Sequence, residues 1–400
     1  MATLDGASGT GKNGGAGEEN KAPLNRAPEM EELVSSYLTR TNGYERNHCI
    51  LPQISESHTL HITGAPIRTP LSLNRNDLLT SFPQHTVLSA LQCAGNRRHS
   101  MRTLMKEVQG LDWRDNAVMN CLWRGPRIRD VIEKAGLIEE ILTEGNENAD
   151  ARDEKEKYRG WYVQFECRRV ECEKDSWYGA GIPLERVMRK EADCILALEM
   201  NNEPLTPAHG YPVRALLPGI AGARSVKWLD RIVVSNKESQ NFYQKFDYKV
   251  LPPHCHDADM AALYWEKTPP VVDMPINSAI GIPAADSTVT VNEEGFVDVV
   301  GYALPAGEDG PVVKVEVSGD EGESWIEATL SYGGHRKKDV SLKWGWCLWY
   351  AKVRMEKGTG RRILSRARDR GGNVQKENCE WNLKGVQYNA YGQVRGLEVV

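Results

Sequence analysis

One cysteine stands in a setting suited to metal chemistry. Cys93 comes just after residues 86–91, separated from them by Gln92. That apolar run is typical of a short strand, so Cys93 is expected where a strand gives way to a loop. Arg97 and Arg98 follow, and two nearby guanidinium groups favour the thiolate, the form that binds soft metals. The small Gly95 lets the backbone approach a bulky ligand. Residue types alone leave two interpretations open, a functional thiolate or a buried structural thiol beside surface arginines.

Histidines and cations recur in other polar segments of the chain. His48 follows Arg46, and His209 precedes Arg214 and Lys227. A buried phosphate needs fixed donors, and here the cations would provide charge while the imidazole N–H groups would provide direction. On residue type alone, His209 is more often a satisfied core or loop histidine, and Arg214 and Lys227 are more often surface charges.

Taken together, these segments resemble one enzyme family. The sequence LQCAGNRR at residues 91–98 resembles the molybdenum-ligand motif of eukaryotic sulfite oxidases and assimilatory nitrate reductases. Trp113 follows Cys93 at about the family's distance. Five other segments resemble family elements in order and spacing: YERNH at 44–48, YGAGIP at 178–183, HGYPVR at 209–214, GARSVKW at 222–228 and WNLKGV at 381–386. The chain is therefore similar to eukaryotic sulfite oxidases, most of all to the haem-free, plant-like type.

The resemblance implies a cofactor, a reaction and a set of site residues. The cofactor would be molybdenum-molybdopterin, with no haem and no flavin, and Cys93 would be the metal's protein ligand. The residues that would hold the cofactor are Tyr44, Glu45, Arg46, Asn47, His48, Cys93, His209, Arg214, Ser225, Val226 and Lys227. The residues that would act in catalysis are Arg46, Cys93, Arg98, Trp113, Tyr178 and Lys384. Sulfite, a small oxyanion, would be oxidised to sulfate, and the electrons would pass to dioxygen or to a separate acceptor.

The chain also departs from the family pattern. Lys384 stands where these sulfite oxidases usually carry arginine and nitrate reductases an uncharged residue, so charge is retained without a planar fork. The family's cofactor-binding aspartate has no evident counterpart near Arg168. Two alternatives therefore stay open: a molybdenum oxidoreductase that acts on another oxyanion or an S-oxide, as nitrate reductases do, and a non-catalytic interaction protein.

The elements that must position these residues form an α+β chain. The resemblance implies a mixed α/β molybdopterin-binding domain with the sulfite oxidase fold, here residues 31–250, and an all-β immunoglobulin-like dimerisation domain, residues 251–400. Apolar residues at i, i+3, i+4 and i+7 predict a helix over 128–135, capped by Gly136. The valines at 313, 315 and 317 alternate with polar residues and predict a sandwich strand. Similar runs at 288–292, 296–302, 347–353 and 362–368 extend the sandwich over about residues 272–383.

Composition excludes several classes of protein. Residues 1–30 carry too few aliphatic side chains to order, and residues 139–157 are charged enough for a surface insertion. The net charge of −5 offers no basic field for nucleic acid, and no apolar run approaches the roughly 18 residues of a membrane span. The nine cysteines are scattered and no signal peptide precedes them, as in a cytoplasmic protein. The last residues, 397–400, give no peroxisomal signal, and a mitochondrial location stays open.

Overall fold

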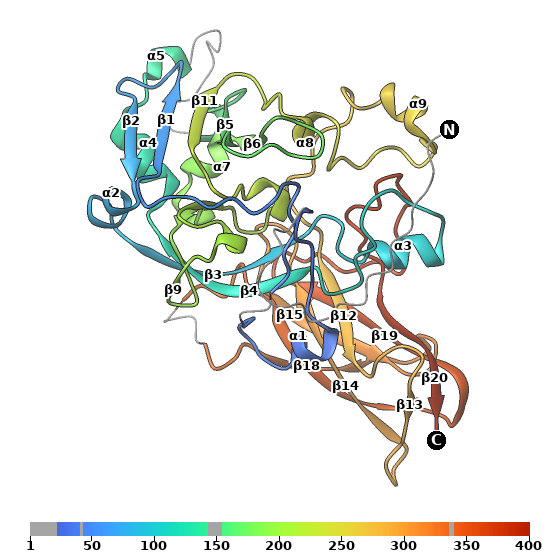
Figure 1. Cartoon of the computed structure of the whole chain (residues 1–400). Helices are drawn as coiled ribbons and strands as arrows, with labels where there is room; N and C mark the ends of the chain where they lie inside the picture. The colour runs from blue at the N-terminus through green and yellow to red at the C-terminus, as the bar shows by residue number, and fades with distance from the viewer. Residues whose placement is uncertain (1–21, 41–42, 143–153, 336–339) are drawn as a thin grey trace.

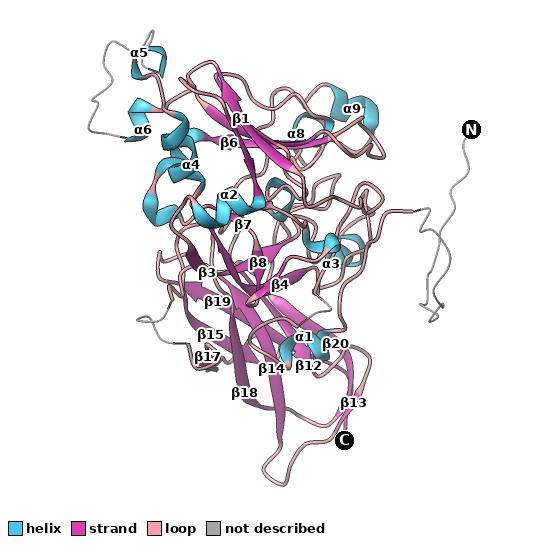
Figure 2. Ribbon diagram, turned by 60° about the vertical axis from the view of Figure 1, so that its left-hand side comes forward, coloured by secondary structure: helices cyan, strands magenta, loops and turns pink. Residues whose placement is uncertain are grey.

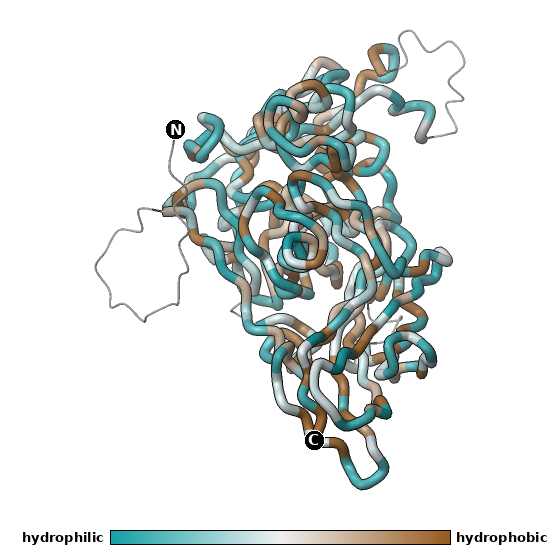
Figure 3. The backbone as a smooth tube through the Cα atoms, turned by 90° about the vertical axis from the view of Figure 1, so that its right-hand side faces the viewer, coloured by the Kyte–Doolittle hydropathy of each residue, from teal (hydrophilic) through white to brown (hydrophobic). Residues whose placement is uncertain are grey.

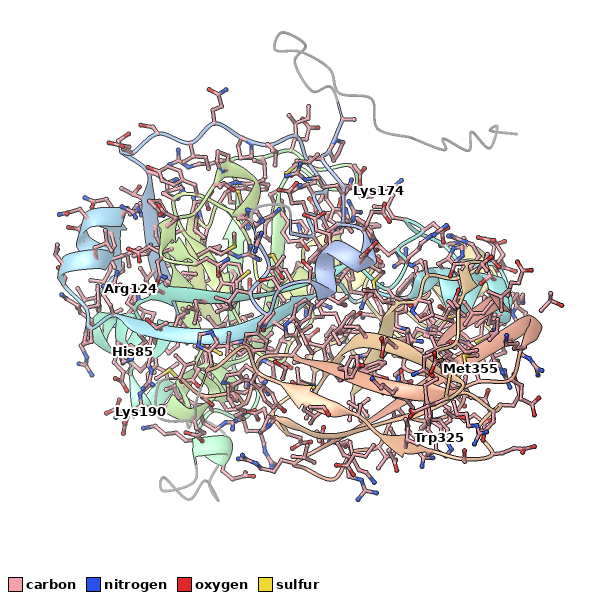
Figure 4. The ribbon with its side chains drawn as sticks, turned by 90° about the horizontal axis from the view of Figure 1, so that it is seen from below. His85, Arg124, Lys174, Lys190, Trp325 and Met355 are labelled. Carbon is pink, nitrogen blue, oxygen red and sulfur yellow. The ribbon has the colours of Figure 1, made fainter. Side chains whose placement is uncertain are left out.

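Two domains of different architecture follow one another along the chain. The structure, a computed structural model, describes residues 22–40, 43–142, 154–335 and 340–400. The first half forms a mixed helix and strand domain, and the second half forms a β-sandwich that extends away from it to the C-terminus (Figure 1). Figure 4 shows His85, Arg124 and Lys190 in the first domain and Trp325 and Met355 in the sandwich. The α+β architecture predicted from the sequence is confirmed.

The first domain is built on three sheets. A five-stranded sheet has the order β2-β1-β11-β5-β6, in which β1 and β11 are parallel and the other pairs are antiparallel. A four-stranded sheet has the order β3-β4-β8-β9, and β7 pairs with β10. The strands are β1 (Thr59–Gly64), β2 (Leu71–Asn74), β3 (His85–Gln92), β4 (Val118–Gly125), β5 (Tyr162–Cys167), β6 (Tyr178–Pro183), β7 (Ile195–Ala197), β8 (Glu199–Met200), β9 (Glu203–Pro204), β10 (Arg214–Leu216) and β11 (Arg231–Ser235).

Short helices surround these sheets, except α1, which packs against the second domain (Figure 2). In α4 the four apolar residues of the predicted stripe are all buried, and Gly136 takes a positive φ of 75° at the C-terminal end, so the predicted helix is confirmed. The helices are α1 (Met30–Val34), α2 (Arg75–Thr80), α3 (Arg98–Leu104), α4 (Ile128–Ala135), α5 (Glu139–Leu142), α6 (Glu154–Lys157), α7 (Leu184–Met188), α8 (Phe242–Lys245) and α9 (Ala258–Ala262), with 3₁₀ turns η1 (Lys190–Ala192), η2 (Pro207–His209) and η3 (Gly222–Arg224).

The second domain is a sandwich of two sheets with an apolar core between them. The sheets have the orders β12-β14-β18-β17 and β13-β20-β19-β15-β16. Hydrophilic and hydrophobic residues alternate along parts of this backbone (Figure 3). The strands are β12 (Asn277–Ile282), β13 (Thr288–Val289), β14 (Phe296–Leu304), β15 (Val312–Ser318), β16 (Ile326–Glu327), β17 (Thr329–Ser331), β18 (Cys347–Arg354), β19 (Gly358–Asp369) and β20 (Gly392–Val399).

Two details of the sandwich differ from the prediction. Val313 is 47% exposed instead of facing the core with Val315 and Val317, because the register of β15 against β19 shifts between Val312 and Lys314. The sandwich also continues beyond residue 383, since β20 completes one of its sheets.

Three predicted segments require a separate account. The prediction that residues 1–30 are disordered is wrong for residues 22–30. Arg26 there forms backbone hydrogen bonds with Glu45 and a 2.7 Å ion pair with its carboxylate. Residues 1–21 lie outside the described residues. Of the insertion at 139–157, residues 143–153 also lie outside them. The boundary at residue 250 stays a prediction. No helix within the described ranges is long and apolar enough to span a bilayer.

Candidate active site

One cavity brings the predicted cofactor-binding residues together. Every one of them lines it, and so does Tyr178. Most of the lining comes from four parts of the first domain: the segment before β1, the end of β3 with the loop after it, the turn around η2 and β10, and the segment from η3 to residue 228. The other lining residues are Cys49, Leu91, Met119, Ala208, Gly222, Ala223, Trp228 and Tyr248.

Cys93 lies where the sequence predicted, directly after β3. Its side chain is buried, and the Gly95 N–H points to Sγ at 3.4 Å. The Cys93 N–H donates to the Ala117 carbonyl, which holds the turn in place. A Cβ on Gly95 would come within 2.5 Å of the Arg98 guanidinium, so a larger residue there would displace that side chain. The turn therefore carries both the Cys93 thiol and the Arg98 guanidinium.

The two arginines of this turn have different roles. Arg97 is fully buried and donates to Asn277 and to the carbonyls of Ala390 and Tyr391, so it fastens the turn to the sandwich. Arg98 begins α3 and donates to the carbonyls of Lys384 and Leu111. Arg98 therefore stays on the side of Cys93, with which it interacts electrostatically, whereas Arg97 is bound to the sandwich.

One end of the cavity holds buried cations without anionic partners. Arg214 donates to the carbonyls of His209 and Ser225 at 3.0 Å, and Lys227 donates to the Ala208 carbonyl at 3.0 Å and to Asn47. No carboxylate among the described residues pairs with either cation. Burial lowers the pKa of Arg214 to about 10, and burial together with Arg214 lowers that of Lys227 to about 7. Charge uncompensated in this way favours an anionic ligand.

His209 lies at the same end and lacks a partner on one nitrogen. Its Nδ1 lies 2.8 Å from the Thr206 hydroxyl, whereas its buried Nε2 has no hydrogen-bond partner in the described structure. Burial and the charges of Arg214 and Lys227 lower its pKa to about 3, so the ring is neutral. Ser225, whose hydroxyl accepts from the Leu217 N–H, and Val226 complete this part of the wall.

His48 connects a cation with a tyrosine on the opposite side. Arg46 Nη2 lies 2.9 Å from His48 Nδ1, and His48 Nε2 lies 2.7 Å from the Tyr248 hydroxyl oxygen. Burial lowers the pKa of His48 to about 4, so the ring carries one proton. Arg46, which only donates, makes the shorter contact with Nδ1, whereas the Glu173 carboxylate lies farther away at 3.3 Å. We therefore assign the proton to Nε2, which donates to Tyr248. The Tyr248 O–H is then available to a ligand in the cavity.

Lys384 and Asp247 form an ion pair next to this tyrosine. Their side chains lie 3.2 Å apart and are mostly buried. Burial would raise the pKa of the Asp247 carboxyl, but Lys384 and the Tyr248 N–H hold it below its ordinary value. Arg98 is linked to Lys384 through its carbonyl, so the C-terminal segment brings a second cation to the site.

Tyr178 lines the cavity, whereas Trp113 lies beside it, and their side chains make different contacts. The Tyr178 hydroxyl donates to the Ala223 carbonyl at 2.9 Å, and its ring stacks on His48. Trp113 packs edge-on against Tyr44, with 6.2 Å between ring centroids, and its buried Nε1 has no partner in the described structure. Arg98, Trp113 and Lys384 do not line the cavity itself; they lie around it.

Sequence reasoning missed four residues of this site: Cys49, Glu173, Asp247 and Tyr248. Glu173 lies 3.3 Å from His48 Nδ1 and 3.9 Å from Arg46, so it supplies a carboxylate near the position where the family's aspartate was sought. A tyrosine beside an aspartate is too common a pair to have marked residues 247–248 as functional.

The residues present fit a molybdopterin carrying a phosphate. The unpaired cations and the orphaned His209 Nε2 supply charge and a directional group at one end, and the Cys93 thiol lies in the same cavity. A thiolate is a suitable soft ligand for molybdenum.

Comparison with known proteins agrees with this reading. Residues 48–243 match the family model "Oxidoreductase molybdopterin binding domain", and residues 268–396 match "Mo-co oxidoreductase dimerisation domain". The chain is 36% identical over 384 residues to the sulfite oxidase of Arabidopsis thaliana, covering 94% of this chain and 92% of that protein. It is 37% identical over 382 residues to the human mitochondrial sulfite oxidase, covering 94% of this chain and 64% of the human protein.

Two further similarities extend the comparison. The chain is 32% identical over 386 residues to the NADH nitrate reductase of Hordeum vulgare, covering 94% of this chain and 40% of that enzyme. The solved structure of the sulfane dehydrogenase SoxCD from Paracoccus pantotrophus has a TM-score of 0.70 at 22% identity, covering 92% of this chain and 85% of that one. The latter supports the fold alone.

Proposed function

Because the chain belongs to the sulfite oxidase family of molybdopterin-binding oxidoreductases, we propose that it oxidises sulfite to sulfate at a molybdenum-molybdopterin centre. The observation that carries this proposal is the joint placement of the Cys93 thiol and two sets of cations, Arg214 with Lys227 and Arg46 with Arg98 and Lys384. The overall reaction consumes one water and releases two protons and two electrons. The electrons pass to dioxygen or to a separate acceptor protein.

The cofactor and the protein divide the work. When bound, the cofactor supplies the two-electron redox chemistry and the oxygen-transfer centre. Cys93 provides the thiolate ligand, and Arg214, Lys227 and His209 hold the phosphate and the pterin. Tyr44, Glu45, Asn47, Ser225 and Val226 shape the remaining wall.

The other cations hold the substrate. Sulfite is a small dianion, and Arg46, Arg98 and Lys384 supply positive charge on its side of the site. Asp247 holds Lys384 in place and reduces the net positive charge around the substrate. The weaker attraction allows the sulfate dianion to leave after the reaction. The Tyr248 O–H donates to an anion oxygen, because His48 already donates to the oxygen of that hydroxyl. Trp113 forms part of the surrounding wall.

The second domain joins two copies of the chain. Its match to a dimerisation domain, together with its two-sheet sandwich, supports a homodimer.

Expression in a host that makes the pterin cofactor tests the proposal. Molybdenum content and sulfite oxidation are measured on one sample, with dioxygen and an artificial acceptor offered in turn. We expect bound metal and sulfite turnover in the wild type, and loss of turnover in Cys93→Ser. Cys379→Ser, a half-buried cysteine outside the cavity, serves as the matched control. A wild type without molybdenum would overturn the proposal and leave an interaction protein as the alternative.

Lys384 favours testing a second substrate in the same experiment. It replaces the arginine of similar sulfite oxidases, and the chain also resembles a nitrate reductase. Bound metal with turnover of nitrate or an S-oxide, but none of sulfite, would identify the other oxyanion as the substrate.

A further inference from the structure

A short segment near the N-terminus pairs with the segment that carries Arg46. Arg26 and Glu45 form an antiparallel β-bridge, in which the Arg26 N–H donates to the Glu45 carbonyl at 3.0 Å and the Glu45 N–H donates to the Arg26 carbonyl at 2.8 Å. The Arg26 guanidinium also pairs with the Glu45 carboxylate at 2.7 Å. In antiparallel pairing the neighbours of a bridged pair also lie opposite each other, so this register brings Asn25 beside Arg46.

The side chain of Asn25 holds Arg46 at two points. Its Oδ1 atom accepts from Arg46 Nη1 at 3.0 Å and from the Asn47 N–H at 3.0 Å. Its Nδ2 atom donates to the Pro23 carbonyl at 3.2 Å, which fixes the orientation of the carboxamide. One oxygen atom therefore holds both the guanidinium of Arg46 and the backbone directly after it.

The other contacts of the Arg46 guanidinium leave part of it free. Nη1 also donates to the Asn47 carbonyl, and Nη2 lies 2.9 Å from His48 Nδ1. Together with Asn25, these acceptors take both hydrogens of Nη1 and one hydrogen of Nη2. Glu173 lies 3.9 Å from Nη2, too far for a hydrogen bond, and nothing else among the described residues accepts from Nη2 or from Nε. Two N–H donors therefore stay available for an anion in the cavity, and the contacts at Nη1 decide where they point.

The N-terminal segment is held in place by contacts that do not need the Asn25 side chain. The Leu24 carbonyl accepts from Asn47 Nδ2, and the Pro28 carbonyl accepts from Asn116 Nδ2 at 2.7 Å. The bridge between Arg26 and Glu45 lies between these two points. A change confined to the Asn25 side chain should therefore leave the segment bound, so its effect on Arg46 can be measured separately.

We propose that Asn25 is a positioning residue for the oxidation of sulfite, because its carboxamide holds the Arg46 guanidinium with its free N–H donors toward the substrate. This role rests on the proposed function, in which Arg46 binds the substrate anion. Asn25 does not line the cavity, so it acts through Arg46. A neutral amide is suited to the task, because it orients the guanidinium without cancelling its charge. Lys384, by contrast, is held by the carboxylate of Asp247.

Steady-state kinetics at equal molybdenum content tests this role. We expect Asn25→Ala to raise KM for sulfite about tenfold, as loss of one hydrogen bond to a charged group does, with kcat changed by less than about twofold. Asn116→Ala is the matched control: it loses the bond to Pro28 on the same segment, lies outside the cavity, and should keep both constants. An unchanged KM in Asn25→Ala would overturn the proposal.

A double-mutant cycle separates positioning of Arg46 from a general structural role. In an Arg46→Met background, Asn25→Ala should raise KM by less than about twofold, because the group that Asn25 positions is absent. A further rise of about tenfold in that background would mean that Asn25 does not act through Arg46, and would overturn the proposal.

Amide hydrogen exchange in the cofactor-free protein tests the placement of Asn25 without activity. The Asn47 N–H donates to Asn25 Oδ1, so Asn25→Ala should speed its exchange about tenfold, whereas Asn25→Asp, which keeps an acceptor oxygen there, should leave it protected. The Glu45 amide, which donates to the Arg26 carbonyl, is the internal control and should exchange at the wild-type rate in both variants. Unchanged exchange at Asn47 in Asn25→Ala would overturn the placement. A wild type without sulfite turnover would refute the proposed function alone, because this experiment needs neither cofactor nor substrate.

Discussion

Two tyrosine hydroxyls lie at the same cavity, but only one of them already donates its proton to the protein. Tyr178 donates to the Ala223 carbonyl, whereas Tyr248 receives a hydrogen bond from His48 and keeps its own proton for a ligand. We therefore expect Tyr248→Phe to lower kcat for sulfite by about 10²-fold, as loss of one preorganised donor does. Tyr178→Phe should lower it by less than about threefold, because its hydroxyl serves the backbone. Steady-state kinetics at equal molybdenum content decides between them. The reverse ranking would make Tyr178, which the sequence predicted to act in catalysis, the donor to the substrate.

Replacing Lys384 by arginine should strengthen the binding of sulfite. Its ammonium pairs with Asp247 at 3.2 Å and has no planar fork with which to hold a second anion. A guanidinium can bind Asp247 and sulfite together, so Lys384→Arg should lower KM for sulfite by about 3–10-fold with a small change in kcat. Lys376→Arg, an exposed position in the second domain, is the control. An unchanged or higher KM would show that Lys384 does not contact the substrate.

At the scale of elements, α4 shows how an apolar stripe stabilises the first domain. Ile132 is fully buried, while Glu133 points to solvent and pairs with Arg129. Truncation of Ile132 leaves a cavity, so Ile132→Ala should lower the free energy of unfolding by about 3 kcal/mol. Glu133→Ala should cost less than about 0.5 kcal/mol, because a surface pair at i and i+4 contributes little. Urea unfolding of the cofactor-free protein measures both, and similar costs would contradict the packing argument.

Elements that depend on local sequence patterns could be predicted, whereas features that depend on contacts between distant segments could not. The stripe of α4 and the strand before Cys93 are local patterns, so periodicity was sufficient. The bulge in β15 depends on its pairing with β19, which no alternation of valines reveals. The site divides in the same way. Cys93 and Arg214 belong to contiguous motifs, whereas Asp247 and Glu173 join the site only through contacts with Lys384 and His48 from distant segments.

At the scale of the whole molecule, the site depends on both halves of the chain. Arg97 fastens the turn after Cys93 to the sandwich, and the Gln387 N–H donates to the Ala94 carbonyl at 2.7 Å. Segment 22–29 supports the other side, since Asn25 accepts from Arg46 and from the Asn47 N–H. Contacts from distant segments therefore hold the buried cations of the cavity close together. Removing these cations from water lowers the free energy of unfolding.

Because of this desolvation cost, the free energy of unfolding should depend on pH in the cofactor-free protein, and bound cofactor should remove that dependence. Burial and Arg214 lower the pKa of Lys227 from 10.5 to about 7 in the folded protein, while the unfolded chain keeps the ordinary value. Between these values the unfolded chain binds more protons, so the free energy of unfolding of the cofactor-free protein should rise with pH, by about 2 kcal/mol from pH 7 to 9. A bound phosphate keeps the ammonium charged and paired, so the loaded protein should lack this rise. Urea unfolding of both forms across this range is the measurement, and Lys227→Met, which has no group to titrate, should show the smaller slope without cofactor. Parallel pH profiles for the loaded and cofactor-free wild type would mean that Lys227 does not meet the phosphate.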